Sequence, residues 1–255
     1  MKKYRAILIL KKIKIKFILQ GFHHKIGLKK DPILKYINYF EIQKIVDVGA
    51  NIGQFATRIN ALGYKNEIHS FEPMEHESNL LKRFSKNNKK WFIYNFGIGE
   101  NYEEQKKIYV SKNSVSSSLL KVNNEHLMAA PKSIQKEVKE INLLSLENAL
   151  ISQINLRKKD PIFLKIDVQG YEMPILRNFE FEKFEIPLIL IEASFTKLYK
   201  NQEGFNQLIN LLYDNNYTIV EMLDSFRSRN KIRNILQTDL VLCRNNYLRK
   251  IPYES

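Results

Sequence analysis

Cysteine is nearly absent from the chain, which has only Cys243 among its 255 residues. A single thiol can form no disulfide within the chain and cannot complete a four-thiolate zinc site. Cys243 lies in the apolar stretch TDLVLCR, where a buried strand thiol is favoured over a nucleophile. This scarcity is consistent with a reducing compartment, and we expect a cytoplasmic location.

Long apolar runs are missing from the N-terminal arm, residues 1–35. Its longest uninterrupted apolar run, from Ala6 to Leu10, is far below the ~20 residues that a bilayer-spanning helix needs. Lysines interrupt the apolar region that a secretory signal would require, and no small-residue cleavage site follows. We therefore expect neither a membrane span nor a secretory signal in this arm.

Acidic residues are missing from residues 1–30, which have ten Lys or Arg residues. The other 225 residues have 31 basic and 27 acidic side chains, so the net charge of +14 resides mainly in the arm. A groove that follows a phosphate backbone usually has basic residues spread through the domain. Nucleic acid is therefore not the partner that we expect.

Two interpretations of the basic arm stay open. Its Ile, Leu and Phe residues are interleaved with lysines, a pattern suited to contact of residues 1–30 with an anionic membrane surface. The protein would then lie peripherally on the inner face of a membrane. Alternatively, the arm is a basic helix or strand that packs on the domain. The sequence does not determine the oligomeric state.

After the arm, strand-like stretches alternate with helical ones. The strand-like stretches are KIVDVG, EIHSFEP, WFIYNFGIG, PIFLKIDVQG, IPLILIEAS, TIVEML and TDLVLCR. Helical spacing occurs in QFATRINAL, EHESNLLKRFSKN and FNQLINLLYDNNY. This alternation predicts a doubly wound α/β domain over residues 36–255, with a mostly parallel sheet and helices on both faces. Such sheets bind ligands beyond the carboxyl ends of their strands, where Gly49, Glu72, Gly97 and Asp167 fall.

The alternation breaks down between residues 101 and 140, where the chain is polar and includes SKNSVSSSLLKVNNEHLMAAPKS. A connection of this length inside a domain is typical of a lid, a binding loop or a disordered segment. His126 lies within this insertion. It is interpreted either as a mobile base or as a solvated loop histidine.

The stretch KIVDVGANIGQF contains the spacing D-x-G-x-N-x-G, from Asp47 to Gly53. Gly49 and Gly53 allow a sharp turn and the close approach of a ligand, and the following helix offers unpaired N–H groups. An acid at Asp47 would repel a pyrophosphate but attract the ammonium and sulfonium groups of S-adenosylmethionine. The next strand ends in Glu72, whose carboxylate can accept hydrogen bonds from both ribose hydroxyls. A helix cap and a solvated loop charge are the alternative roles of these two acids.

Three blocks, IVDVGANIGQF, SFEP and FLKIDVQGYEMPIL, resemble the FkbM family of S-adenosylmethionine-dependent methyltransferases, within the Class I superfamily. They have the same order and similar spacing, and KIDVQGYE is the more specific element. Family members usually have Glu where this chain has Gln169. The resemblance covers about residues 42–192. It implies a seven-stranded, Rossmann-like Class I fold and O-methylation of a hydroxyl on a sugar, a surface glycan or a secondary metabolite.

The resemblance also implies the position of the cofactor. The turn from Asp47 to Gly53 would surround the methionine part, Glu72 would hold the ribose, and Gly97 with Ile98 would approach the adenine. The residues implied to bind S-adenosylmethionine are Asp47, Gly49, Ala50, Asn51, Gly53, Glu72, Pro73, Gly97, Ile98 and Asp167.

Asp167 would lie beside the transferred methyl group, and it is the first candidate to orient or deprotonate the acceptor. Its alternative role is to bind the amino group of the cofactor or to cap the next helix. Glu192 and His126 are the other catalytic candidates. Tyr171 and Glu172 are expected to line the pocket.

Magnesium is a further hypothesis for the same edge of the sheet. Asp167, Glu192 and Asp239 follow three strand ends, and oxygen ligands suit Mg²⁺. No compact ligand motif in the sequence supports such a site.

Other classes of protein have weaker support. An RNA methyltransferase could use the basic arm, but the chain has no N/D-P-P-Y-like motif for exocyclic amines. A nicotinamide oxidoreductase would require a third glycine in the first turn and no acid at its start. A non-catalytic glycan-binding protein on the same fold stays open, and binding of the cofactor would distinguish it from an enzyme.

Overall fold

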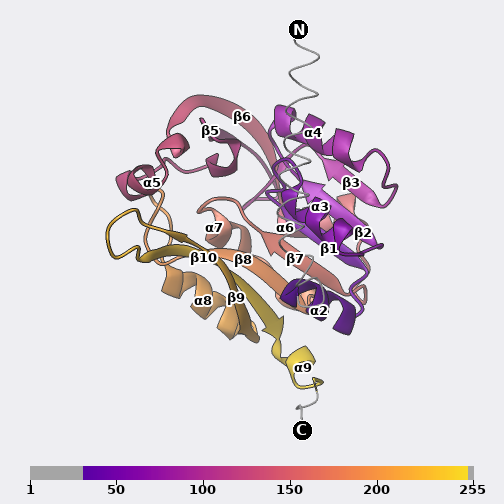
Figure 1. The fold of residues 1–255 in the computed structure, drawn as a ribbon. Helices are drawn as coiled ribbons and strands as arrows, with labels where there is room; N and C mark the ends of the chain where they lie inside the picture. The colour runs from indigo at the N-terminus through magenta and orange to yellow at the C-terminus, as the bar shows by residue number, and fades with distance from the viewer. Residues whose placement is uncertain (1–30, 252–255) are drawn as a thin grey trace.

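The computed structural model describes residues 31–251, except for the side chain of Asp224, and its main feature is one large sheet (Figure 1). In this described part the sheet has seven strands in the order β3-β2-β1-β7-β8-β10-β9. In that order they are β3 (Trp91–Tyr94), β2 (Glu67–Phe71), β1 (Lys44–Val48), β7 (Ile162–Ile166), β8 (Leu188–Ser194), β10 (Ile235–Arg244) and β9 (Tyr217–Arg227). In this sheet β10 runs opposite to the other six strands. The predicted mostly parallel, seven-stranded α/β fold is confirmed.

The strand order reverses between β1 and β7, the two central strands. From β1 the chain first builds β2 and β3 on one side, and it later returns to place β7 and β8 on the other. β1 lies in register with both neighbours, so that Asp47 is opposite Ser70 on β2 and Lys165 on β7. Ligands of doubly wound sheets bind outside the carboxyl ends of the strands at this reversal. The sequence motifs therefore meet at the position that the topology favours.

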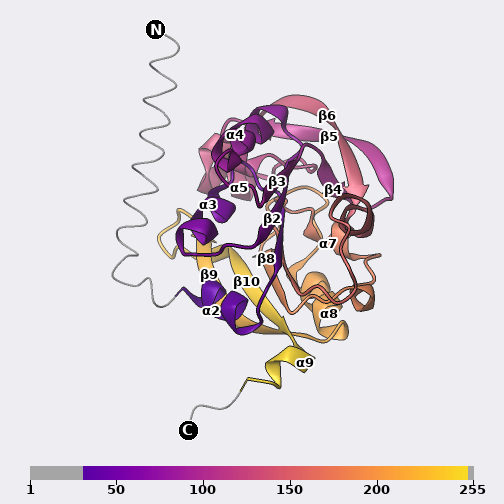
Figure 2. The same ribbon diagram turned by 90° about the vertical axis from the view of Figure 1, so that its right-hand side faces the viewer.

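Helices cover both faces of the sheet (Figure 2). One face is covered by α2 (Pro32–Tyr39), α3 (Gln54–Ala61) and α4 (Glu75–Ser85), and the other by α6 (Leu146–Asn148), α7 (Glu172–Leu176) and α8 (Phe205–Asp214). The short α9 (Asn245–Leu248) follows β10. The remaining turns are the 3₁₀ helices η2 (Ser114–Ser116), η3 (Pro131–Ser133) and η5 (Phe181–Lys183) and the π-helical turn η4 (Ala149–Gln153).

Local sequence explains where these helices begin and which face they bury. Asp31 caps α2 by accepting hydrogen bonds from the backbone N–H groups of Ile33 and Leu34, at 3.0 and 3.2 Å, with proline as the first helical residue. In α8 the buried residues Leu208 and Leu212 are spaced by one helical turn. Helical periodicity thus places apolar side chains against the sheet.

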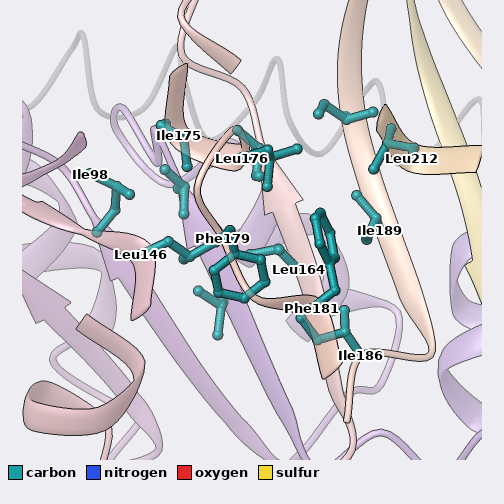
Figure 3. Close-up of a cluster of buried hydrophobic side chains, with 14 of the residues drawn as sticks. Ile98, Leu146, Leu164, Ile175, Leu176, Phe179, Phe181, Ile186, Ile189 and Leu212 are labelled. Atoms are coloured by element: carbon teal, nitrogen blue, oxygen red, sulfur yellow. The ribbon is translucent and has the colours of Figure 1, made fainter. Parts of the chain in front are cut away.

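Alternate residues of each strand face opposite sides of the sheet. Leu164 and Ile189 belong to the core beneath α7 and α8, which Figure 3 shows. Phe163 belongs to the core beneath α2, α3 and α4. By the same alternation, Asp47 and Lys165 lie on the α3 side of the sheet, and both are buried. Two buried charges in the middle of a sheet require partners.

Residues 101–140 fold into ordered structure rather than an irregular connection. They contribute β5 (Glu103–Ser111), α5 (Asn124–Ala129) and the start of β6 (Gln135–Ser145). With β4 (Gly97–Gly99) these strands form a second sheet in the described part of the chain, in the order β4-β6-β5. The disordered alternative for the insertion is therefore wrong. The sequence analysis missed these strands because β5 and β6 are largely polar and exposed, so that their alternation is weak.

The predicted third strand, WFIYNFGIG, is divided between the two sheets. β3 pairs with β2, whereas Gly97 of β4 pairs with Leu143 of β6. Asn95 lies between them, and its amide nitrogen donates to the carbonyl oxygens of Glu72 and Pro73, both at 3.1 Å. At this break, the amide of Asn95 holds the chain beside the end of β2, while the following residues pair with β6.

Two further expectations concern Cys243 and membrane spans. Cys243 lies buried in β10, where burial raises the pKa of its thiol to about 12. No helix within residues 31–251 is long and apolar enough to cross a membrane. Residues 1–30, to which the membrane-docking interpretation applies, lie outside the described residues.

Candidate active site

The turn after β1 packs directly against the end of β7. Gly49 has a φ of 76°, and a Cβ atom at this position would lie 1.9 Å from the carbonyl oxygen of Asp167. No side chain fits at that distance, so the contact between the two turns requires glycine. The sequence analysis attributed this glycine to the approach of a ligand. The atoms that exclude a side chain here belong to the backbone of the protein itself.

Helix α3 begins as soon as this turn ends. Gly53 is its N-cap, with a φ of 85°, and a Cβ atom there would lie 2.7 Å from Leu81 and 2.9 Å from the ring of Trp91. Asn51 has a φ of 49°, and its side-chain oxygen accepts a hydrogen bond from Gln54 at 3.1 Å. The first N–H groups of α3 have no partner within the helix. They and the half-buried Asn51 can therefore meet an anionic group such as the carboxylate of a methionine.

A polar row crosses the sheet just below these turns. Lys165 Nζ lies 3.0 Å from Asp47 Oδ1 and 3.6 Å from Asp167 Oδ2. On the other side of Asp47, the hydroxyl of Ser70 donates to Oδ2 at 3.4 Å and itself accepts from the indole of Trp91 at 2.9 Å. Burial opposes the charge of Lys165, but the carboxylates of Asp47 and Asp167 outweigh it and raise the pKa of the amine.

This row changes the role expected for Asp47. The sequence analysis placed its carboxylate against the ammonium and sulfonium groups of a ligand. In the structure Asp47 is 0% exposed and lies against the amine of Lys165. In this ion pair each buried charge compensates the other, and the pair joins β1 to β7 beneath the site. Asp167, whose side chain is 37% exposed, is the acid of this row that faces outward.

Glu72 ends β2 and lies beside the Asn51 turn. Its Oε2 accepts the backbone N–H of Asn51 at 2.8 Å, and its Oε1 accepts that of Met74 at 2.9 Å. Burial raises the pKa of this carboxyl to about 7, although the two backbone hydrogen bonds favour the ionised form. Each oxygen retains a lone pair for a further donor. The geometry fits the ribose role that the sequence analysis gave to Glu72.

The other cofactor residues expected here have different surroundings. Ala50 is buried, and its backbone N–H donates to the carbonyl oxygen of Phe71 at 3.0 Å, which ties the turn to the end of β2. Pro73 is half-buried, and a Cβ atom on Gly97 would lie 3.3 Å from its ring. Pro73 and Gly97 therefore lie side by side next to Glu72. Ile98 is packed into the core beside Leu146, which Figure 3 shows, and its side chain does not face outward.

The carboxyl ends of β7 and β8 are joined through Gln169. Its amide nitrogen donates to Asp167 Oδ1 at 2.9 Å and to the two oxygens of Glu192 at 3.0 and 2.9 Å. Burial, the charge of Asp167 and other nearby carboxylates raise the pKa of Glu192 well above its ordinary value. The amide thus holds two acids side by side, one half-exposed and one that favours its protonated form.

The backbone of Gln169 has a φ of 59°, a conformation that is costly for a residue with a side chain. Surrounding contacts hold it there. The hydroxyl of Tyr199 donates to Gln169 Oε1 at 2.8 Å, and the hydroxyl of Ser118 donates to its carbonyl oxygen at 2.7 Å. Because Ser118 belongs to the insertion, the second sheet helps to fix the orientation of Gln169. Where the family usually has Glu, this chain has a neutral donor.

The insertion also contacts the site at two other points. The hydroxyl of Ser114 lies 3.5 Å from Asn51 Oδ1, and the amine of Lys106 donates to the hydroxyl oxygen of Tyr171. Tyr171 is 6% exposed, and burial raises the pKa of its phenol. The insertion therefore touches the turn after β1 and the turn after β7. It lies where a lid or binding loop was expected.

Glu172 supports the β7 turn from the inside. Its Oε1 accepts the backbone N–H groups of Val168 at 3.0 Å and Gly170 at 3.2 Å. Burial raises the pKa of this carboxyl to about 7. The side chain is 4% exposed, so it braces the turn rather than lining a pocket.

His126 has surroundings that neither interpretation of the sequence anticipated. It is 4% exposed on α5, its Nε2 is 3.0 Å from the hydroxyl of Ser133, and its ring packs against Tyr199 and Phe226. Burial lowers its pKa to about 4. The expectation of a mobile or solvated loop histidine is wrong, because α5 and the aromatic rings enclose it. Tyr199 lies between this histidine and Gln169.

The expected magnesium ligands do not assemble into a site. Within residues 31–251, no group of three or more His, Cys, Asp or Glu side chains is arranged to hold a metal ion. Asp239 is opposite Glu192 in the strand register. The amide of Gln169, however, donates to both Asp167 and Glu192 where a cation would have to lie. The described residues therefore do not support magnesium as a cofactor.

The strand order, the glycine-containing turn after the first strand and the acid that follows the second are those of a Class I S-adenosylmethionine-dependent methyltransferase. The sequence model of the family described as "Methyltransferase FkbM domain" matches residues 47–219, which is more than half of the chain. The chain belongs to this family and is a methyltransferase that uses S-adenosylmethionine. No curated protein matches the chain.

Several solved structures of methyltransferases are similar in fold. A magnesium protoporphyrin IX methyltransferase from Synechocystis PCC 6803, with bound cofactor, is 9% identical with a TM-score of 0.43, covering 87% of this chain and 79% of that one. A putative RNA methyltransferase from Pyrococcus horikoshii is 10% identical with a TM-score of 0.40, covering 83% and 79%. A methyltransferase from Aquifex aeolicus is 10% identical with a TM-score of 0.38, covering 83% and 89%.

Sequence reasoning missed three residues that organise the site: Lys165, Gln169 and Tyr199. One signal for Lys165 was available, because a lysine inside the apolar stretch IFLKI, two residues before Asp167, must face the same side of the strand as that acid. Gln169 was noted only as a departure from the family. Tyr199 gave no local signal, since its contact with Gln169 spans 30 residues of sequence.

Proposed function

We propose that the protein transfers the methyl group to a hydroxyl oxygen, on a sugar of a surface glycan or on a secondary metabolite. The observation that carries this proposal is the group Asp167–Gln169–Glu192 at the ends of β7 and β8. A hydroxyl must lose its proton when it is methylated, and a half-exposed carboxylate at this edge can accept that proton. An exocyclic amine acceptor would instead favour an N/D-P-P-Y-like motif, which the chain lacks.

We propose the following arrangement of the cofactor. Glu72 accepts hydrogen bonds from the ribose hydroxyls, while Asn51 and the first N–H groups of α3 contact the methionine part. Pro73 and Gly97 lie on the adenine side. The buried carboxyl of Glu72, with unused lone pairs beside the turn, supports this arrangement. S-adenosylmethionine supplies a methyl group activated as a sulfonium.

The two linked acids have different tasks in this proposal. Asp167 is the exposed one, so it orients the acceptor hydroxyl and takes its proton as the oxygen–carbon bond forms. Glu192 lies behind it and favours the protonated form, which limits the repulsion between the two carboxyls. Gln169 fixes the distance between them. His126 has no contact with either acid, and we assign it no catalytic step.

The test is to find where the methyl group goes. The purified full-length protein is incubated with S-adenosylmethionine carrying a trideuterated methyl group and with glycan and metabolite fractions from a strain that lacks its gene. We expect a labelled methyl ether in the wild-type reaction and none with Asp167→Asn. Label on an amine, on RNA, or on no product while the cofactor binds would contradict O-methylation. The last outcome would favour a non-catalytic binding protein.

We also propose that residues 1–30 bring the enzyme to the anionic inner face of a membrane, where a lipid-linked glycan acceptor would be found. The support is the density of lysines interleaved with apolar residues. Replacing Lys11, Lys12, Lys14 and Lys16 by Gln in the full chain should abolish salt-sensitive sedimentation with anionic vesicles, at ~1 kcal/mol for each charge. Unchanged sedimentation would show that the arm serves another purpose.

A further inference from the structure

A basic cavity lies at the loop between β9 and β10, away from the acids of the active site. Its volume is about 590 Å³, within the range of small-molecule sites. Figure 1 shows this golden loop beside α5, and Ala129 at the end of α5 forms part of the wall. The other lining residues are Ser225, Phe226, Arg227, Ser228, Arg229, Asn230, Lys231 and Arg233.

The charge of this lining has one sign. The lining residues that the structure describes include four with cationic side chains and none with an acidic one. Among the described residues, neither Arg229 nor Lys231 forms an ion pair, and both are exposed. Uncompensated arginines around a cavity attract an anion, and their planar guanidinium groups can donate two parallel hydrogen bonds to a phosphate.

The loop is held in shape by its own uncharged polar groups. The hydroxyl of Ser228 lies 2.8 Å from Asn230 Oδ1 and 2.6 Å from Asn234 Oδ1 and donates its one hydrogen between these acceptors. Asn230 Nδ2 donates to Asn234 Oδ1 at 2.9 Å. The backbone N–H of Arg233 donates to Asn230 Oδ1 at 2.7 Å. These bonds satisfy the loop and leave the cationic ends of Arg229 and Lys231 for a ligand. A loop ordered before binding loses less entropy when the ligand binds.

The cavity is connected to the active site through direct contacts. Phe226, in its lining, packs against His126 with ring centroids 5.5 Å apart, and His126 packs against Tyr199 at 5.1 Å. Tyr199 donates to Gln169, whose amide holds Asp167. Three rings, those of Phe226, His126 and Tyr199, therefore lie between the cations and the group proposed to act on the hydroxyl. His126 and Tyr199 are buried, so they form a packed connection between the cavity and Gln169.

We propose that this cavity binds the phosphate or diphosphate group of the acceptor, so that the acceptor is a phosphorylated sugar or glycan. The link to the acceptor rests on the proposed O-methylation, whereas anion binding by the cavity does not. Four cations around one small cavity fit a compact, multiply charged group. A nucleic acid would instead need basic residues extended along a groove, and the body of the chain is nearly balanced in charge.

Calorimetric titration of the full-length protein with pyrophosphate, without cofactor or acceptor, tests the site. The variant Arg229→Glu/Lys231→Glu reverses two unpaired charges on an exposed loop. The control Lys158→Glu/Lys159→Glu makes the same change in net charge on exposed lysines before β7. We expect saturable binding in the wild type and in the control, and a loss of ~tenfold or more in affinity in the loop variant. Equal thermal midpoints of the three proteins confirm that the fold is intact.

Three outcomes would overturn the proposal. The first is that pyrophosphate shows no saturable binding. The second is that the loop variant and the control lose affinity for pyrophosphate to the same extent. The third is that the loop variant binds pyrophosphate normally and loses only its sedimentation with anionic vesicles or only its binding of RNA. The source of the phosphate is resolved by competition. A soluble nucleoside diphosphate that displaces pyrophosphate supports a soluble acceptor, whereas displacement only by vesicles containing phosphatidic acid supports a lipid-linked one. Because the titration contains no methyl donor, its failure and a failure of methyl transfer are distinguishable.

Discussion

The two turns at the centre of the main sheet lie against the insertion of residues 101–140. The two regions differ in the range of the interactions that hold them in place. The turns are short and specified by neighbouring residues, with Gly49 fitted against the backbone of Asp167. The insertion is held by the pairing of β5 with β6, which joins residues up to 41 positions apart, such as Glu103 and Leu144. Its contacts with the turns are a few hydrogen bonds, such as that from Ser118 to Gln169.

This difference separates the part that binds the common cofactor from the part that can vary with the acceptor. A turn that tolerates no side chain cannot change without loss of the fold. Polar strands with exposed faces can change their side chains at little cost in stability. We therefore expect substitutions in the turns to act on folding and on cofactor binding, and substitutions in the insertion to act mainly on turnover.

The largest effect should come from Gly49→Ala. The new methyl group would lie 1.9 Å from the carbonyl oxygen of Asp167, so the two turns must separate and the centre of the sheet must open. We expect little soluble protein, or a large loss of thermal stability. Gly63→Ala is the matched control, since Gly63 also has a positive φ, of 109°, but has no atoms within 4 Å of the added group. Equal stability of the two variants would show that the contact between Gly49 and Asp167 does not exclude a side chain.

The next effect should come from Lys165→Met, which leaves the fully buried carboxylate of Asp47 without its cation. Removing one partner of a buried ion pair costs ~3–5 kcal/mol of folding free energy. Urea unfolding measures this loss. The double variant Lys165→Met/Asp47→Asn should recover most of it, because no uncompensated charge remains. A double variant no more stable than Lys165→Met would show that the pairing is unimportant.

Glu72→Ala should weaken cofactor binding without unfolding the protein. Loss of charge-assisted hydrogen bonds to the ribose corresponds to ~1–3 kcal/mol, or about 5- to 150-fold in dissociation constant. Calorimetric titration with S-adenosylmethionine measures the change, and Glu75→Ala on the exposed start of α4 is the control. Equal affinity of the Glu72 variant and the wild type would remove this residue from the cofactor site.

The pH dependence of the same titration sharpens this test. Burial raises the pKa of Glu72 to about 7, and hydrogen bonds from the ribose favour its ionised form. Below that pH the free protein holds a proton that binding must release, so affinity should fall as pH decreases, by at most ~tenfold per pH unit. Above it the affinity should be constant. Glu72→Gln should flatten the profile, and a profile that rises toward low pH would contradict the assignment.

The smallest effect should come from the insertion. Ser118→Ala removes the donor to the carbonyl oxygen of Gln169, at a cost of ~1 kcal/mol in stability, and loosens the amide that holds Asp167. We expect turnover to fall several-fold while the affinity for S-adenosylmethionine is unchanged. Ser117→Ala, in the same segment, is the control. A lower cofactor affinity in the Ser118 variant would contradict the expectation that the insertion affects turnover and not cofactor binding.

Much of the main sheet could be predicted from the sequence, because each strand and turn has a local signature. Asp47, Glu72 and Asp167 each end or nearly end an apolar run, and parallel strands bring such ends together. The glycines of the first turn were found for the same reason, although their cause is packing rather than ligand approach. The terminal carboxylates Glu72 and Asp167 lie where the pattern placed them.

The rest depends on contacts that no local pattern contains. The separation of β4 from β3 follows from the pairing of Gly97 with Leu143, 46 residues later. The role of Gln169 depends on a backbone with positive φ and on Tyr199, which a sequence pattern does not display. His126 was expected to be solvated because its segment is polar, and only the fold shows that α5 and Phe226 enclose it.

The most direct test of the account is a comparison of turnover and cofactor affinity in Asp167→Asn. The half-exposed carboxylate of Asp167 contacts Gln169 and Lys165, whereas only its backbone meets the cofactor turn. Removing the carboxylate should therefore affect the acceptor step alone. We predict a fall in turnover of ~10²–10⁴-fold, the usual contribution of a general base, with a dissociation constant for S-adenosylmethionine close to that of the wild type. Asp160→Asn, before β7, should leave both quantities unchanged. A parallel loss of affinity and turnover would mean that Asp167 binds the cofactor, and wild-type turnover would contradict the account.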